Sequence, residues 1–122
     1  MKENYKINDN KIIINDIEHV MDYPIKTTKS INGKIIILLN IPRGITIANE
    51  EKCNILCYDN VGNFQWRVNE SLPKGIESTD LIPYIDIDID IQDKKLYGFD
   101  FWGRKFHIDI STGELLDFKV FR

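Results

Sequence analysis

The sequence predicts an all-β protein, and three observations support this fold class. Short apolar runs are separated by clusters of Asn, Asp, Gly and Pro, which favour turns. Residues 85–91 alternate isoleucine with aspartate without a break, as in a strand with one face on a core. No segment combines helical spacing of apolar residues with capping residues. At 122 residues the chain is expected to form one domain, residues 1–122.

The first half of the chain is expected to form short antiparallel strands. Residues 5–14 predict a hairpin around Asn8–Asn10, because Asn and Asp favour turns. Residues 17–23 fit either a further strand or two helical turns. Asn32-Gly33 predicts a tight hairpin turn. The unbroken apolar run 35–39 predicts a strand covered on both faces.

The second half continues in the same way, with Gly103 expected in the left-handed conformation of a turn. Its expected strands are residues 53–58, 64–68, 85–91, 95–101, 104–109 and 114–121. Residues 40–52 and 69–83 predict loops, and long loops often have functional roles. Altogether the pattern predicts about eight to ten strands and no helix longer than about two turns.

Residues 24–68 and 83–121 look like two repeats. In each, the expected third strand ends in a turn that begins with aspartate and contains glycine, Asp59–Asn63 and Asp109–Gly113. Only the first turn is followed by a tryptophan, Trp66. These features resemble quinoprotein-type propeller blades. The resemblance implies two four-stranded blade-like repeats. Since two blades cannot close a propeller, we expect two antiparallel sheets packed face to face, plus an N-terminal hairpin.

The layout of Asn54–Asp59 followed by Trp66 also resembles small bacterial proteins encoded beside polymorphic toxins. In such systems, including contact-dependent inhibition, these proteins act as immunity proteins. The resemblance implies a protein that binds a cognate toxin domain and blocks its active site. It supplies no catalytic residue for this chain.

Charge is distributed unevenly along the sequence. The net charge is −3, which disfavours nonspecific binding to nucleic acid. Residues 70–100 contain eight acidic residues and three lysines, so this block alone has a charge of 3 − 8 = −5. Such a field attracts a cationic partner, here expected to be a basic toxin domain such as a nuclease.

The alternating strand is expected to place four isoleucines on the core side and three aspartates on the opposite side. The acidic side is either simply solvated or faces a basic partner. Aspartates two residues apart on a strand are separated by about 6.6–6.8 Å. They are too far apart to converge on one calcium ion, whose ligands lie at about 2.3–2.6 Å. We therefore expect no metal here.

The predicted partner-binding surface combines the strand aspartates with acidic residues of the preceding loop and two aromatic residues. It comprises Asp86, Asp88, Asp90, Glu77, Asp80, Tyr97 and Trp102. The aromatic residues Tyr97, Phe99, Phe101 and Phe106 are expected mostly in the core. Trp102 lies beside Gly103 in a turn, where it either forms an interface hot spot or covers the end of a sheet.

No group of residues predicts catalysis or a cofactor. His19 and His107 have no neighbouring nucleophile or ligand-spaced partner, so both are expected to be structural. Cys53 and Cys57 would lie about 13 Å apart on a strand, too far for a disulfide. Free thiols and a polar N-terminal start without a secretion signal favour the cytoplasm.

Three functional hypotheses follow. The first is a cytoplasmic immunity protein that neutralises a toxin domain through its acidic surface. The second is a propeller-type ligand-binding or assembly module, with its site in residues 40–52 and 69–83. The third, an enzyme, is disfavoured because no acid–base pair is apparent.

Overall fold

The computed structural model describes residues 5–42, 48–73 and 81–120. These ranges form three antiparallel sheets and one short helix, α1 (Asn49–Lys52). The first sheet contains β1 (Tyr5–Asn8), β2 (Lys11–Ile14) and β3 (Ile17–Val20). The second contains β4 (Ile25–Ile31), β5 (Lys34–Leu39), β6 (Ile55–Asp59) and β7 (Phe64–Arg67). The third contains β8 (Tyr84–Asp90), β9 (Lys95–Asp100), β10 (Arg104–Ile108) and β11 (Leu115–Val120).

Each sheet is a simple meander, because its strands are paired in chain order. Tight turns between neighbouring strands use residues with positive φ, including Asn32 (51°) and Gly33 (74°). Gly103 also has a positive φ, 81°, as predicted. The sequence therefore specifies the local hairpins through turn residues that tolerate this conformation.

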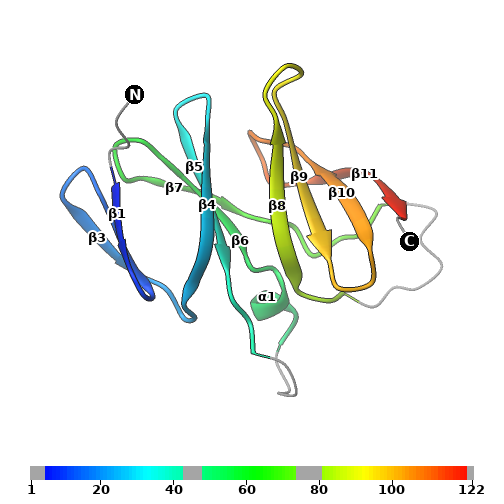
Figure 1. Ribbon diagram of the computed structural model, residues 1–122, viewed down its shortest axis with the longest axis horizontal. Coiled ribbons are helices and arrows are strands. Elements are labelled where there is room, and N and C mark those ends of the chain that lie inside the picture. Colours follow the sequence, from blue (N-terminus) through cyan, green and yellow to red (C-terminus); the bar gives the residue numbers. More distant parts are fainter. Residues whose placement is uncertain (1–4, 43–47, 74–80, 121–122) are drawn as a thin grey trace.

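The three sheets lie side by side, with the β4–β7 sheet in the middle (Figure 1). One core cluster lies between the β1–β3 and β4–β7 sheets, and another lies between the β4–β7 and β8–β11 sheets. β5 contributes to both, since Ile35, Ile37 and Leu39 belong to the first cluster, and Ile36 and Leu38 to the second. The prediction that residues 35–39 are covered on both faces is confirmed.

The all-β prediction is confirmed, but the expected number of sheets was wrong. The described chain contains three sheets and eleven strands, where two sheets, an N-terminal hairpin and eight to ten strands were expected. The difference arises at Ile17–Val20, which pairs with β2 and converts the hairpin into a three-stranded sheet. The helical alternative for this segment is thereby excluded.

The aspartate strand departs from strict alternation. A bulge between Tyr84 and Asp86 shifts the register against β9, so that Tyr84 and Ile87 both point into the core. Ile85 in the bulge is 41% exposed, and Ile91 beyond the strand is 83% exposed. The expectation that all four isoleucines share the core side was therefore wrong. The bulge reverses the facing of Ile85, and Ile91 lies in the turn after the strand.

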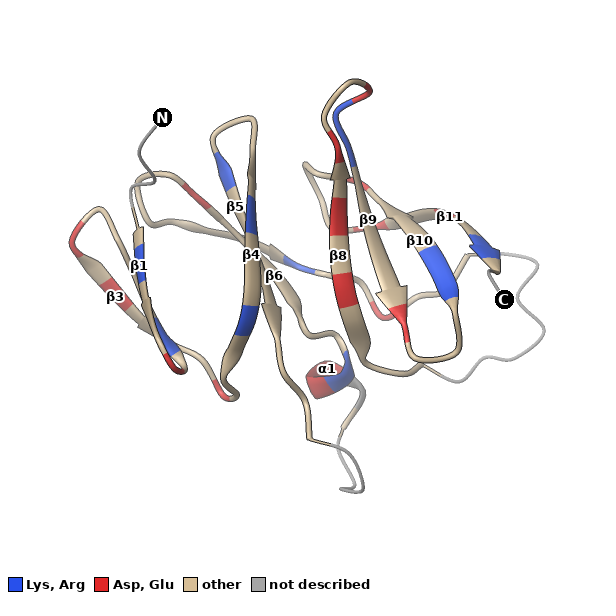
Figure 2. Cartoon of the chain, in the orientation of Figure 1, with Lys and Arg blue, Asp and Glu red and all other residues tan. Residues whose placement is uncertain are grey.

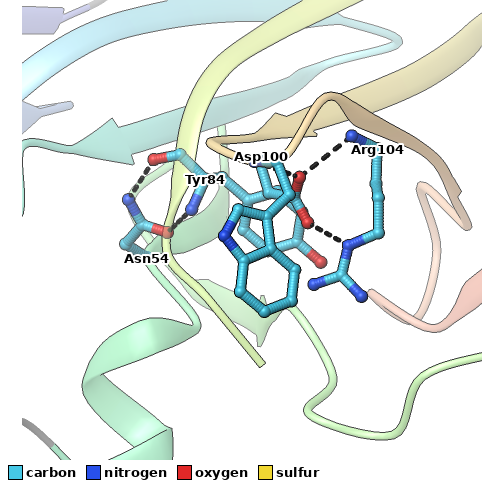
Figure 3. Close-up of polar contacts among 5 residues, drawn as sticks. Asn54, Tyr84, Asp100 and Arg104 are labelled. Carbon is cyan, nitrogen blue, oxygen red and sulfur yellow. Dashed lines mark hydrogen bonds and ion pairs between the residues drawn. The ribbon is translucent and has the colours of Figure 1, made fainter. Parts of the chain in front are cut away.

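Polar contacts join the middle sheet to the third sheet. Asn54 is fully buried and donates from Nδ2 to the carbonyls of Leu39 and Tyr84, each at 2.8 Å. Its Oδ1 accepts from the Tyr84 N–H at 2.8 Å (Figure 3). Trp66 donates from Nε1 to the Ile110 carbonyl at 2.6 Å. These bonds fix where β8 and the β10–β11 turn lie on the middle sheet.

Candidate protein-binding surface

The β8–β11 sheet has one side on the core and one side without a covering sheet in the described part of the chain (Figure 1). We call the second side the open face. Its side chains alternate with buried ones, as the burial of Leu96, Phe106 and Ile108 shows. The open face includes Asp86, Asp88, Tyr97, Phe99, Lys105 and His107.

Strand register brings these residues into two rows across the sheet. In one row, Asp86 lies opposite Phe99, which lies opposite Lys105. In the other, Asp88 lies opposite Tyr97, which lies opposite His107. On β11 the rows continue with Lys119 opposite Lys105 and Asp117 opposite His107. In both rows, the carboxylate of β8 therefore lies beside an aromatic ring of β9.

The aromatic rings of the open face are half-buried and contact a cation from the chain itself. Lys105 Nζ lies 4.1 Å from the centre of the Tyr97 ring and 5.6 Å from that of Phe99. The rings of Tyr97 and His107 lie 5.5 Å apart. Tyr97 and Phe99 were expected mostly in the core; they lie on the open face because their strand buries Leu96 and Gly98 instead.

The three strand aspartates have different environments. Asp86 accepts from the Ile87 N–H at 2.9 Å. Asp88 is exposed and makes no hydrogen bond or ion pair with another described residue. Asp90 accepts from the N–H groups of Gln92 and Asp93, both at 3.1 Å, and therefore organises the β8–β9 turn. Asp86 and Asp88 are the two aspartates best placed to meet a partner.

Trp102 does not join this group. It lies in the β9–β10 turn and is 50% exposed. The Arg104 guanidinium carbon lies 5.2 Å from its ring centre, and Arg104 itself is buried on the core side of the sheet. The tryptophan ring thus lies over Arg104 at the end of the sheet with half of its surface exposed, and its role at an interface stays a prediction.

Asp100 shapes the turn that contains Trp102. Its carboxylate accepts from the N–H groups of Trp102 and Arg104 at 3.1 and 3.0 Å. It also forms an ion pair with Arg104 Nε at 2.6 Å (Figure 3). Both partners are buried, so this carboxylate contributes to the structure rather than to the surface charge.

The acidic surface is consequently narrower than the sequence block of −5 indicated. Asp100 is paired internally, and Asp90 lies opposite Lys95. Glu77 and Asp80, which were also predicted to bind a partner, lie outside the described residues. Figure 2 shows the acidic stretch on β8 beside the lysines of β4, where Lys26 Nζ donates to the Ile85 carbonyl at 2.6 Å.

The remaining candidate residues have structural positions. His19 Nε2 lies 2.9 Å from the Gly62 carbonyl oxygen, and its ring lies 4.4 Å from that of Tyr58. Cys53 and Cys57 are free and buried in the core. Burial raises the pKa of Cys53 to about 11 and that of Cys57 to about 12. Within the described ranges, no group of three or more His, Cys, Asp or Glu is arranged to hold a metal.

Sequence reasoning missed three residues of the open face: Phe99, Lys105 and His107. A signal for them existed in the hairpin 95–108. Tyr97 and Phe99 alternate with Leu96 and Gly98, and register places Lys105 and His107 across from them. The alternation of residues 85–91 predicted an uncovered side for that strand, but the prediction was not extended to the strands that pair with it.

A groove lies at the edge of the same sheet. It has a volume of about 580 Å³ and runs between residues 69–73 and the first part of β11. Its apolar lining residues are Leu72, Pro73, Leu115, Leu116 and Phe118. Part of the loop 69–83, which was considered as a ligand site, therefore borders a surface groove, while residues 74–80 lie outside the described part of the chain.

The fold and surface together define a class: an all-β protein of three antiparallel meander sheets, with core clusters between neighbouring sheets and an open face on the third. A family model, "Domain of unknown function (DUF7957)", matches residues 2–120, and the chain belongs to this family. No curated protein and no solved structure matches the chain. The described residues contain no helix long and apolar enough to cross a membrane.

Proposed function

We propose that this chain is a non-catalytic binding protein that holds a cationic protein partner on the open face. One observation supports the proposal above others: Asp86 and Asp88 lie beside half-buried aromatic rings on a sheet side that no described sheet covers. Aromatic residues supply contact area at interfaces. The carboxylates supply attraction and orientation for a basic partner.

A protein partner fits this surface better than a nucleic acid. The open face presents carboxylates at its β8 edge, and the chain has a net charge of −3, so phosphate groups are repelled. A sheet side of four strands is also broad enough for a protein surface. A basic nuclease domain has the complementary charge, because its active site must attract phosphate.

The immunity role is the more specific part of the proposal. It draws on the likeness of Asn54–Asp59 and Trp66 to immunity proteins and on the acidic edge of the open face. In this role the chain would act in the cytoplasm, where it would cover the active site of a toxin encoded by a neighbouring gene. The family description adds no activity to this argument.

We further propose that the two four-stranded sheets are blade-like repeats, which supports a second candidate, a propeller-type assembly module. Support comes from corresponding turns. The carboxylate of Asp59 accepts from the Val61 N–H at 3.1 Å, and that of Asp109 from the Ser111 N–H at 2.8 Å. In both turns a glycine packs on the preceding sheet: Gly62 on Ile17, and Gly113 on Trp66.

The test is co-expression with the product of the adjacent gene. The proposal predicts that the chain restores growth when that product is toxic, and that the two proteins copurify. Hydroxyl-radical labelling of the complex should then show protection of Tyr97 and Phe99. Phe64, which is 54% exposed on the middle sheet, is the matched control and should react equally in the free and bound states.

Two results would contradict the proposal. Continued toxicity without a complex would remove the immunity role. A complex that protects β1–β3 and leaves Tyr97 and Phe99 fully reactive would place the interface elsewhere. The assembly candidate predicts instead that the chain alone elutes as an oligomer whose mass, by light scattering, falls on dilution.

A further inference from the structure

We infer that the open face selects arginine over lysine and binds two arginine side chains of its partner at once. This inference rests on the proposed function, because it specifies the chemistry of the partner at the same face. It begins with two neighbouring pairs: Asp86 lies directly across from Phe99, and Asp88 directly across from Tyr97. Each pair places a carboxylate beside an aromatic ring.

Cross-strand geometry brings the members of each pair within reach of one ligand. Residues directly opposite each other on antiparallel strands have Cβ atoms about 4.5–5.5 Å apart. Both aspartates are exposed, and both rings are half-buried on the same side. A single side chain from a partner therefore meets a negative charge and a ring face together.

Arginine satisfies both halves of such a pair. Its planar guanidinium stacks on an aromatic ring while its N–H groups donate to a carboxylate in the plane of the group. A lysine ammonium is a compact, strongly hydrated charge and cannot make the planar stack. The combination of carboxylate and ring therefore favours arginine over lysine more strongly than a carboxylate alone does.

A cation of the chain already lies at this position. Lys105 Nζ is 4.1 Å from the Tyr97 ring centre and 5.6 Å from the Phe99 ring centre. The rings are thus oriented to accept a positive charge from above the sheet. An incoming arginine has to displace Lys105 from the rings, so Lys105 lowers the affinity for the partner.

The spacing of the pairs defines the partner further. Asp86 and Asp88 are two residues apart on one strand, which corresponds to about 6.6–6.8 Å. Two arginines at positions i and i+2 of a partner strand match this distance. Arginines at i and i+4 of a helix, about 5–6 Å apart at Cβ, also match.

The experiment titrates the full chain with two short capped peptides, one with two arginines separated by a single serine and one with lysines in their place. Binding is followed by NMR chemical shifts at low salt. The arginine peptide is expected to bind roughly 3- to 10-fold more tightly and to shift the resonances of Asp86, Asp88, Tyr97 and Phe99.

Two variants test the assigned contacts, each against wild type. Tyr97→Leu should reduce the preference for arginine, while Phe64→Leu, the control on β7, should leave it unchanged. Lys105→Met should tighten arginine binding by roughly 2- to 5-fold, because it removes the competing cation. Weaker binding by Lys105→Met would overturn the competing role assigned to Lys105. It would also overturn the assignment of the arginine position to the space above the two rings.

The possible outcomes separate this inference from the proposed function. Equal binding of the two peptides would overturn arginine selection and leave a basic partner in place. If neither peptide binds but the neighbouring gene product still protects Tyr97, arginine selection would likewise be overturned and the proposed function would stand. No binding of peptides or gene product would overturn both. A dimer of the chain that protects Tyr97 and Phe99 from hydroxyl radicals, and that the arginine peptide does not dissociate, would overturn the inference as well.

Discussion

The middle and third sheets share the same four-stranded meander but differ in what covers them. The β4–β7 sheet has core clusters on both sides, so five consecutive residues of β5, Ile35–Leu39, are at most 3% exposed. Among the described residues, the β8–β11 sheet has a core cluster on one side only, and its other side carries charged and aromatic residues. The same topology therefore supports two roles, a central layer and a surface layer.

This difference indicates where substitutions should affect stability and where they should affect binding. Between the two sheets, Asn54 and the backbone groups of Tyr84 are buried and hydrogen-bonded to each other, so the loss of these bonds is costly. Groups on the open face remain in contact with water in the free protein, so their loss has little effect on folding. The predictions below test this division in order of decreasing effect on stability.

The largest effect is expected at Asn54. Asn54→Ala removes the bonds to both backbone groups of Tyr84 and leaves these groups buried and unpaired. The free energy of unfolding should fall by about 4 kcal/mol. Urea denaturation followed by circular dichroism measures this change. A loss below about 1 kcal/mol would show that the packing between the middle and third sheets does not depend on this side chain.

The next effect is expected at Gly113. Its φ is +79°, and an added Cβ would lie 2.7 Å from Trp66 Cε3. Gly113→Ala should therefore lower the unfolding free energy by about 3 kcal/mol, through backbone strain and overpacking together. Gly33→Ala is the matched control, because its φ is +74° but its nearest neighbour is 3.7 Å away. Equal losses for the two variants would contradict the close contact with Trp66.

The cysteines test whether the core between the middle and third sheets becomes accessible to solvent in the native state. Cys53 and Cys57 are 3% and 0% exposed, and burial raises the pKa of both thiols. At pH 8, about one Cys53 thiol in a thousand is ionised, so a disulfide reagent should react slowly. Reaction should become fast in denaturant. Rapid, complete labelling of the native protein would mean that the middle sheet is poorly covered.

Much of this comparison could be predicted from the sequence, since it depends on local patterns. Asn32-Gly33 specified a hairpin, and the unbroken run 35–39 specified a strand buried on both faces, as observed. The alternating strand could not reveal its own bulge, because a bulge depends on pairing with Asp100 and Phe99 of β9. Alternation therefore predicted the strand but not the exposure of Ile85.

The candidate surface was only partly predictable for a related reason. Asp86, Asp88 and Tyr97 were predicted, and the structure places them together. Trp102 was grouped with them from chain proximity, yet it lies against Arg104 at the end of the sheet. The hydrogen bonds from Asn54 to Tyr84 were not predicted, although a polar residue directly before the apolar run 55–57 was a visible signal. Such roles depend on contacts distant in sequence.

The central claim is that the open face binds a cationic partner, and Asp88→Lys tests it most directly. Asp88 is exposed and makes no hydrogen bond or ion pair with another described residue, so the unfolding free energy should change by less than about 0.5 kcal/mol. Glu18→Lys is the matched control, because it makes the same charge change on exposed β3 of the first sheet.

The measurement is a titration of wild type and both variants against the product of the neighbouring gene, at low and high salt. Asp88→Lys should bind more weakly at low salt, and the difference should shrink as salt screens the charges. Glu18→Lys should bind like wild type. Equal affinity of Asp88→Lys and wild type at low salt would contradict the account, since the open face would then be a solvated surface without a role in binding.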